Sequence, residues 1–104
     1  MAKIPNEIRK AVLKFKADIR NDLDVKKVIL FGSYVKGNYT KNSDIDVCVI
    51  ADNVKNDFLA LMKIIPKVID SDVRIEPVVF SQKEYGVPVS FGLLNEVKKI
   101  GIEI

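Results

Sequence analysis

The segment that most constrains the fold is Ile45–Ala51, in which Asp46 is the one residue that is not apolar. The run has the length of a strand and is far too short to cross a membrane. A strand with one solvated face would alternate apolar and polar residues, so this run predicts a strand that is covered on both faces. In a chain of 104 residues, that cover has to come from helices packed on a small sheet.

Helical and strand patterns alternate along the rest of the chain. Pro66 limits the second expected helix, and Gly101 ends the third. Pro77 favours either a strand at a sheet edge or the end of a strand. We therefore predict a single domain over residues 1–104 with an α+β fold, in which a small mixed β-sheet is flanked by helices. The expected elements are helices at 5–23, 54–65 and 90–100, and strands at 28–31, 45–51, 73–80 and 102–104.

The chain has no histidine and one cysteine, Cys48. The lack of histidine excludes histidine metal sites and serine–histidine triads, so carboxylates, hydroxyls and backbone amides must carry any chemistry. We expect Cys48 to be a small core residue rather than a nucleophile. A lone cysteine cannot form an intrachain disulfide, which is typical of a protein in the reducing cytoplasm.

The net charge of +3 comes from lysines that are scattered along the chain rather than grouped. This balance suits a partner that carries phosphates without indicating DNA or RNA, and we expect no nucleic-acid partner. The first residues, MAKIPNEIRK, lack the apolar core of a signal peptide, and no apolar run approaches the length of a membrane span. We therefore expect a cytoplasmic protein with no membrane partner.

Gly32 and Ser33 follow an apolar run that ends at Phe31. A strand that stops here and enters a helical turn would offer unpaired N–H groups and the positive end of a helix dipole, which together suit phosphate oxygens. Glycine lets the backbone approach a ligand closely, Ser33 adds a hydroxyl donor, and Gly37 lets the loop turn back to the sheet. On its own, the Gly-Ser pair is a weak signal that more often marks an ordinary turn.

Asp44 and Asp46 stand at the start of the buried strand. Residues two apart on a strand share a face, with Cα atoms about 6.6 Å apart. Two carboxylates this close repel each other by roughly a few kcal/mol in a partly buried site. Mg²⁺ would turn the repulsion into attraction, because it binds carboxylate oxygens and leaves positions open for phosphates. The alternative is that Asp44 caps a turn and Asp46 is solvated on an open strand.

A third carboxylate would complete a metal-assisted site, and Glu76 is the candidate. It lies within the expected strand 73–80 with apolar residues on both sides. Arg74 would share its face, since it is two residues earlier, so a plain Arg74–Glu76 ion pair is the competing interpretation.

Gly32-Ser33, Gly37 and Ser43-Asp44-Ile45-Asp46 together resemble the signature of the nucleotidyltransferase superfamily that includes DNA polymerase beta. More narrowly, they resemble the minimal nucleotidyltransferases of prokaryotes, which are often partnered with HEPN-domain proteins in toxin–antitoxin modules. The resemblance implies a polymerase beta-like fold and a transfer of AMP from ATP that depends on two Mg²⁺ ions. It implies metal binding and catalysis by Asp44, Asp46 and Glu76, and nucleotide binding by Gly32, Ser33, Lys36, Gly37 and Ser43.

The resemblance and the short chain favour a protein adenylyltransferase that acts as an antitoxin. Its acceptor would be a hydroxyl, expected to be that of a tyrosine, on a HEPN-domain toxin. Two alternatives remain open: a small-molecule acceptor held by a separate subunit, or a non-catalytic nucleotide-binding partner that neutralises a toxin by binding it. A homo- or hetero-oligomer is also left open, and Tyr85 and Phe91 fit either a partner surface or the core.

Overall fold

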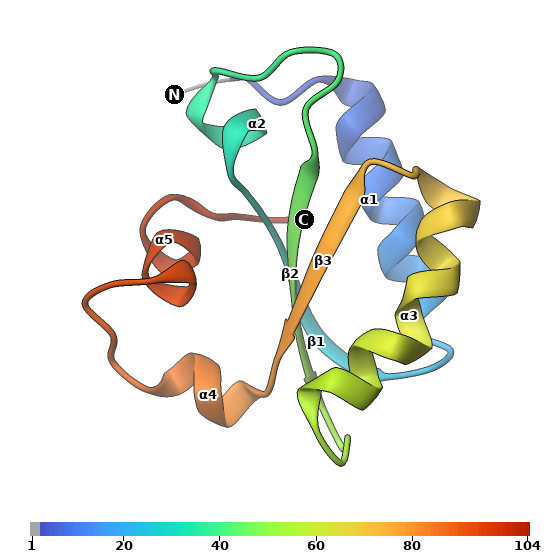
Figure 1. Cartoon of the computed structure of the whole chain (residues 1–104), viewed down its shortest axis with the longest axis vertical. Coiled ribbons are helices and arrows are strands. Elements are labelled where there is room, and N and C mark those ends of the chain that lie inside the picture. The colour runs from blue at the N-terminus through green and yellow to red at the C-terminus, as the bar shows by residue number, and fades with distance from the viewer. Residues whose placement is uncertain (1–2) are drawn as a thin grey trace.

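The computed structural model describes residues 3–104, and over these residues four strands form one mixed sheet (Figure 1). The strands are β1 (Asp24–Phe31), β2 (Ile45–Asp52), β3 (Ile75–Phe80) and β4 (Ile102–Glu103). They lie in the order β3-β2-β1-β4. β1 is antiparallel to both of its neighbours, whereas β2 and β3 are parallel. As expected for a strand that contains Pro77, β3 lies at a sheet edge.

Helices cover both faces of this sheet, so the predicted α+β fold with a small mixed sheet is confirmed. Over the described residues they are α1 (Asn6–Ile19), α2 (Ser33–Lys36), α3 (Asp57–Ser71), α4 (Gln82–Gly86) and α5 (Leu93–Ile100). α1 and α3 pack on one face, and α4 and α5 lie on the other (Figure 1). α4 begins with a capping box, in which Ser81 and Glu84 each accept a hydrogen bond from the other's backbone N–H.

β2 is covered on both sides, as its apolar run predicts. Ile45, Val47 and Val49 face α1 and α3, while Cys48 and Ile50 face α5. All five side chains are fully buried. Burial raises the pKa of the Cys48 thiol to about 12, so this cysteine is a core residue and not a nucleophile.

Several element boundaries differ from the predictions. α1 ends at Ile19 rather than at residue 23, α3 begins at Asp57 rather than at 54, and α5 begins at Leu93 rather than at 90. Two further differences, at the end of α3 and the start of β1, have clear physical reasons. α3 continues through Pro66 to Ser71, because Ile64 and Val68 extend its buried side and that packing outweighs the roughly 3 kcal/mol that an interior proline costs. β1 begins at Asp24 rather than Val28, since its polar first half pairs with the end of β2.

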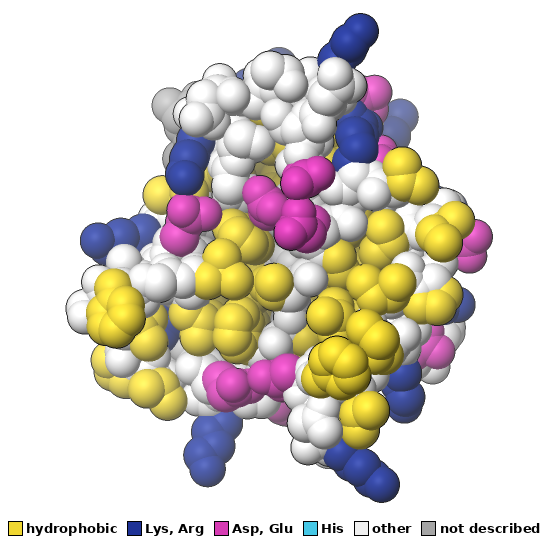
Figure 2. Space-filling model, in the orientation of Figure 1, with side chains coloured by type: hydrophobic (Ala, Val, Ile, Leu, Met, Phe, Trp, Pro, Cys, Tyr) yellow, Lys and Arg dark blue, Asp and Glu magenta, His cyan; other side chains and the backbone are white. Residues whose placement is uncertain are grey.

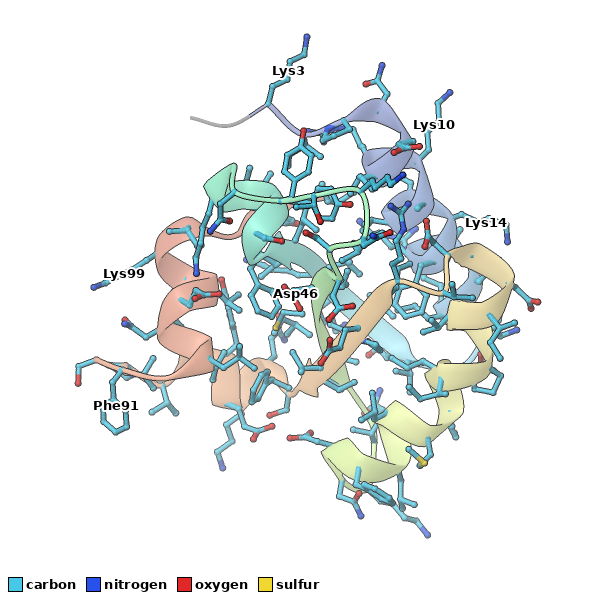
Figure 3. The ribbon with its side chains drawn as sticks, turned by 45° about the horizontal axis from the view of Figure 1, so that its top comes forward. Lys3, Lys10, Lys14, Asp46, Phe91 and Lys99 are labelled. Carbon is cyan, nitrogen blue, oxygen red and sulfur yellow. The ribbon has the colours of Figure 1, made fainter. Side chains whose placement is uncertain are left out.

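Tyr85 and Phe91 have different surroundings. Tyr85 is partly buried against the α5-side core. Phe91 is 83% exposed and points away from the body of the protein (Figure 3). Packing in the core is therefore wrong for Phe91. Within residues 3–104, no helix has both the length and the apolar character that crossing a bilayer requires.

Candidate active site

Three carboxylates that are far apart in the sequence meet at one end of the sheet. Asp46 is the second residue of β2, where it is paired across one side with Phe31 and across the other with Glu76 of β3. Asp44 lies two residues before it, on the same face. Figure 2 shows acidic side chains gathered in one group on this face, and Asp46 is labelled near the centre of Figure 3. We call Asp44, Asp46 and Glu76 the acidic cluster.

The carboxylates of the acidic cluster interact strongly enough to shift proton binding. A hydrogen bond with the Asp44 side chain, together with the charges of Asp44 and Asp46, raises the pKa of Glu76. Burial is the main cause of the raised pKa of Asp46, to which the charges of Asp44 and Glu96 add. Asp46 is partly buried on a strand that is paired on both sides, so the alternative in which it is solvated on an open strand is wrong.

The turn between β1 and α2 lies directly against this cluster. Gly32 adopts φ +79° and ψ −152°, a backbone conformation that is nearly restricted to glycine. A Cβ atom at this position would overlap the Asp46 carboxylate. The first hydrogen bonds of α2 run from the N–H groups of Val35 and Lys36 to the Gly32 carbonyl. The N–H groups of Ser33 and Tyr34 precede these bonds, at the start of the helix where backbone donors have no partner within the helix.

The guanidinium of Arg74 forms hydrogen bonds that hold the loop before Asp44 in place. It donates to the carbonyl of Lys41 at 3.1 Å and to the hydroxyl of Tyr34 at 3.4 Å. Its ion-pair partner is Asp72, at 2.8 Å, and not Glu76. The competing Arg74–Glu76 ion pair is therefore wrong, and Glu76 is left facing the other carboxylates.

The remaining predicted nucleotide-binding residues surround the cluster and have structural contacts of their own. Ser43 accepts a hydrogen bond from the Thr40 N–H at 2.8 Å and closes the loop before Asp44. Gly37 ends α2 with φ +88°. Lys36 donates to Glu96 of α5 at 3.1 Å. Lys36 is thus held near the site by an ion pair with Glu96, a residue that the sequence analysis did not identify.

Glu96 was missed because the sequence around it predicts only a surface position on a helix and gives no indication of a site. Only the packing of α5 beside α2 brings it to Lys36 and within electrostatic range of Asp46. Sequence spacing cannot reveal this contact, which joins residues 60 positions apart.

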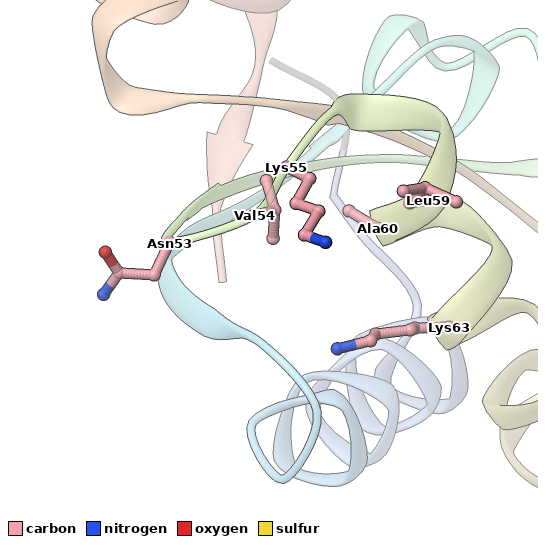
Figure 4. A pocket seen from close by; sticks show the side chains of 6 residues that line it. All are labelled: Asn53, Val54, Lys55, Leu59, Ala60 and Lys63. Atoms are coloured by element: carbon pink, nitrogen blue, oxygen red, sulfur yellow. The ribbon is translucent and has the colours of Figure 1, made fainter.

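Two cavities, each of about 330 Å³, lie away from the carboxylates. One is lined by residues of the β2–α3 connection and α3, including Lys55 and Lys63 (Figure 4). The other lies between Lys36 and the end of α5. In the acidic cluster itself, Asp44 and Glu76 are exposed and Asp46 is partly buried. Among residues 3–104, no three Cys, Asp or Glu side chains are already spaced as the ligands of one metal ion.

Comparison with known sequences places the chain in a family. The sequence model of the "Nucleotidyltransferase domain" family matches residues 7–100. A protein of Methanocaldococcus jannaschii named "Putative protein adenylyltransferase MJ0141" is 31% identical over 103 residues, which cover 94% of this chain and 99% of that protein. A second protein of that organism with the same kind of name, MJ1379, is 32% identical over 74 residues, which cover 67% of this chain and 74% of that protein.

Solved structures share the fold. A crystal structure of a toxin–antitoxin with AMP-PNP matches with a TM-score of 0.58 and 27% identity, over 95% of this chain and 72% of that one. A crystal structure of "a putative nucleotidyltransferase from Sulfolobus solfataricus" matches with a TM-score of 0.57 over 99% of this chain and 89% of that one. At 19% identity it supports the fold alone. The predicted family resemblance is confirmed, and the chain belongs to the nucleotidyltransferase domain family.

Proposed function

We propose that this chain is an antitoxin that transfers AMP from ATP to a tyrosine hydroxyl of a HEPN-domain toxin. The observation that carries the proposal is the juxtaposition of the acidic cluster with the Gly32–Ser33 turn. One element suits a cation and the other suits phosphate oxygens, and a metal-bound nucleoside triphosphate requires both. The relatives named "Putative protein adenylyltransferase" and the toxin–antitoxin structure with AMP-PNP support a nucleotide substrate and a toxin partner.

The residues of the acidic cluster fit Mg²⁺ because they supply carboxylate oxygens, the ligands this ion prefers, and because their mutual repulsion needs a cation to relieve it. We propose that Asp44, Asp46 and Glu76 would hold two Mg²⁺ ions. When bound, these ions would neutralise the triphosphate and favour ionisation of the acceptor hydroxyl.

Side chains and backbone groups of this chain would then orient the triphosphate and accept the proton of the attacking hydroxyl. The Ser33 hydroxyl and the N–H groups at the start of α2 would hold the outgoing phosphates, with Lys36 adding a positive charge after it leaves Glu96. The acceptor oxygen attacks the α-phosphorus of ATP. The bond between the α-phosphorus and the oxygen that bridges the α- and β-phosphates breaks, and pyrophosphate leaves. Glu76 takes up the hydroxyl proton as the general base, a task that a carboxylate beside the attacking oxygen can perform.

The test is to incubate the chain with labelled ATP, Mg²⁺ and the purified product of the neighbouring gene. We expect the partner to gain mass in whole AMP units, and Asp46→Ala to abolish this gain. Binding of Mg²⁺-ATP, measured by calorimetry, should weaken in the same variant. If Asp46→Ala labels the partner and binds nucleotide as the natural chain does, the proposed site is wrong. Toxin neutralisation without AMP transfer would favour a non-catalytic partner.

A further inference from the structure

α3 is apolar on two sides, and one of them faces solvent. The exposed side, which we call the α3 stripe, consists of Phe58, Met62, Ile65, Ile69 and Val73. Their spacing of three and four residues sets them in one line along the helix and the turn after it. Phe58 is 66% exposed and Ile69 is 71% exposed, although the opposite side of α3 is buried in the core. A continuous line of large exposed apolar side chains indicates a contact with another molecule.

The α3 stripe lies on the same face of the protein as the acidic cluster. Figure 2 shows apolar side chains over α3 beside the acidic group, in one view. The stripe ends at Val73, two residues before β3, and β3 carries Glu76 into the cluster. A protein seated on the stripe is therefore beside the proposed reaction centre rather than behind it.

The charged side chains around the α3 stripe are distributed unevenly. Asp57 lies at one end, next to Glu84 of α4, and the exposed Asp70 follows Ile69 at the other end. The lysines of α3 lie on the side toward α1. Lys67 is 3.9 Å from Asp22, and Lys63 lines the cavity of Figure 4. The complementary surface is thus apolar with lysine or arginine at its margins.

The adjacent sheet edge limits how a partner can bind. The carbonyl of Arg74 accepts from Ile45 of β2, so in β3 the even-numbered residues bond to β2 and Pro77 faces the open edge. Because proline has no N–H, it interrupts the donors that an added strand needs. The edge therefore disfavours strand addition, and contact through side chains, as from an apolar helix face, is favoured.

We propose that the α3 stripe is the docking surface for the protein that carries the acceptor hydroxyl, and that this protein presents an apolar helix face flanked by basic residues. The inference rests on the proposed function. A second copy of this chain fits less well, because a symmetric pairing would bring the acidic ends of two stripes together. An anionic membrane is disfavoured by the same acidic ends.

Single charges placed on the stripe test the proposal. Met62→Glu and Ile69→Glu put a carboxylate in the middle and at the end of the line, at positions exposed enough to leave folding intact. Leu13→Glu on α1 is the matched control, because Leu13 is 48% exposed and Met62 is 46% exposed. Three properties are compared between the natural chain and the three variants. They are AMP transfer to the neighbouring gene product, formation of a complex with that product in sedimentation velocity experiments, and affinity for Mg²⁺-ATP.

We expect both stripe variants to lower kcat/KM for the partner by about tenfold or more, through KM, as charging a docking surface does. Mg²⁺-ATP affinity should be unchanged, and Leu13→Glu should behave as the natural chain. If the stripe variants modify the partner normally, the docking surface is wrong while the proposed function stands.

If the natural chain transfers no AMP, the proposed function fails and sedimentation decides about the stripe. A complex that Met62→Glu disrupts would still support the docking surface, and an unaffected complex, or none, would overturn it. A homodimer of the natural chain that Met62→Glu separates, or flotation with anionic phosphatidylserine vesicles, would assign the stripe to another occupant and overturn the proposal.

Discussion

Gly32 and Asp46 are packed so closely that no side chain fits between them. A Cβ atom built on Gly32 would overlap a carboxylate oxygen of Asp46 and lie 2.9 Å from its Cγ atom. The turn that is proposed to hold phosphates and the acid that is proposed to hold metal are therefore in direct contact. A substitution at either position must disturb the other.

Gly32→Ala is expected to weaken Mg²⁺-dependent ATP binding by about tenfold or more, because the added methyl group displaces a proposed metal ligand. It should also destabilise the fold by about 1–3 kcal/mol, since its backbone conformation is nearly restricted to glycine. Calorimetry and urea denaturation measure the two effects.

Gly92→Ala separates backbone strain from displacement of Asp46. Gly92 has a similar conformation, φ +87° and ψ −171°, but a Cβ atom there would meet nothing within 4 Å. It should lose stability and keep ATP affinity. Equal loss of affinity in the two alanine variants would contradict the importance of the Gly32–Asp46 contact.

The acidic cluster should cost the metal-free protein stability at neutral pH. The pKa of Glu76 is raised above its ordinary 4.5, so the stability it contributes is present below that pH and is lost as the pH rises through the raised value. Glu76→Gln is therefore expected to raise Tm at pH 7 in the absence of Mg²⁺ and to have little effect near pH 4. Added Mg²⁺ should raise Tm in the natural chain more than in the variant. A lower Tm for Glu76→Gln at pH 7 would show that the carboxylate is stabilising instead.

The local parts of this site were predictable, and the long-range parts were not. The shared face of Asp44 and Asp46 follows from the two-residue period of a strand, and the apolar run after them fixes that strand in the core. Glu76 could be proposed because an acid between apolar strand residues is unusual. The partners of Arg74 and Lys36 are set by how separate elements pack, which spacing along one chain does not encode.

The boundaries of α3 and β1 show the same limit. Pro66 is a local signal to end a helix, but the buried Ile64 and Val68 on either side of it decide the outcome. The polar start of β1 gives no strand signal of its own and is extended by pairing with β2. Tertiary contacts override local preference in both places.

Arg74 is expected to act as a positioning residue for the loop before Asp44. Arg74→Lys keeps the positive charge but loses the planar fork that bonds Asp72, Lys41 and Tyr34 together. We expect the rate of AMP transfer to fall by about tenfold, with a smaller change in ATP affinity. Tyr34→Phe removes one of these contacts and should give an intermediate loss. If Tyr34→Phe and Arg74→Lys both react at the natural rate, the loop does not depend on this network.

Asp57 and Glu84 form a second carboxylate pair, whose titration should affect the stability of the fold. Burial, followed by a hydrogen bond with Glu84, raises the pKa of Asp57 from 3.8 to about 6. The stability that this group contributes is therefore full below about pH 4 and is lost as the pH rises through about 6. The lowered pKa of Glu84 acts in the opposite sense, but only as the pH falls below its ordinary 4.5.

In the natural chain, the free energy of unfolding should decrease as the pH rises from about 4.5 to 7, and Asp57→Asn is expected to make this decrease smaller. Urea denaturation at several pH values measures it, with Asp70→Asn on the same helix as the control. A natural chain whose stability rises over this interval, with the same slope in Asp57→Asn, would contradict the assignment.

Lys36 and Glu96 should have opposite effects on nucleotide affinity. Their ion pair is 3.1 Å long and about half exposed, so breaking it costs only about 0–1 kcal/mol and Lys36 is free to move to a triphosphate. Glu96→Gln should tighten Mg²⁺-ATP binding by roughly twofold to fivefold, because it releases Lys36 and removes a negative charge near Asp46. Lys36→Met should weaken binding by about tenfold, the scale of one hydrogen bond to a charged group. Lys99→Met on α5 controls for net charge, and calorimetric titration measures all three. Weaker binding in Glu96→Gln would mean that Glu96 holds Lys36 in its working position rather than away from it.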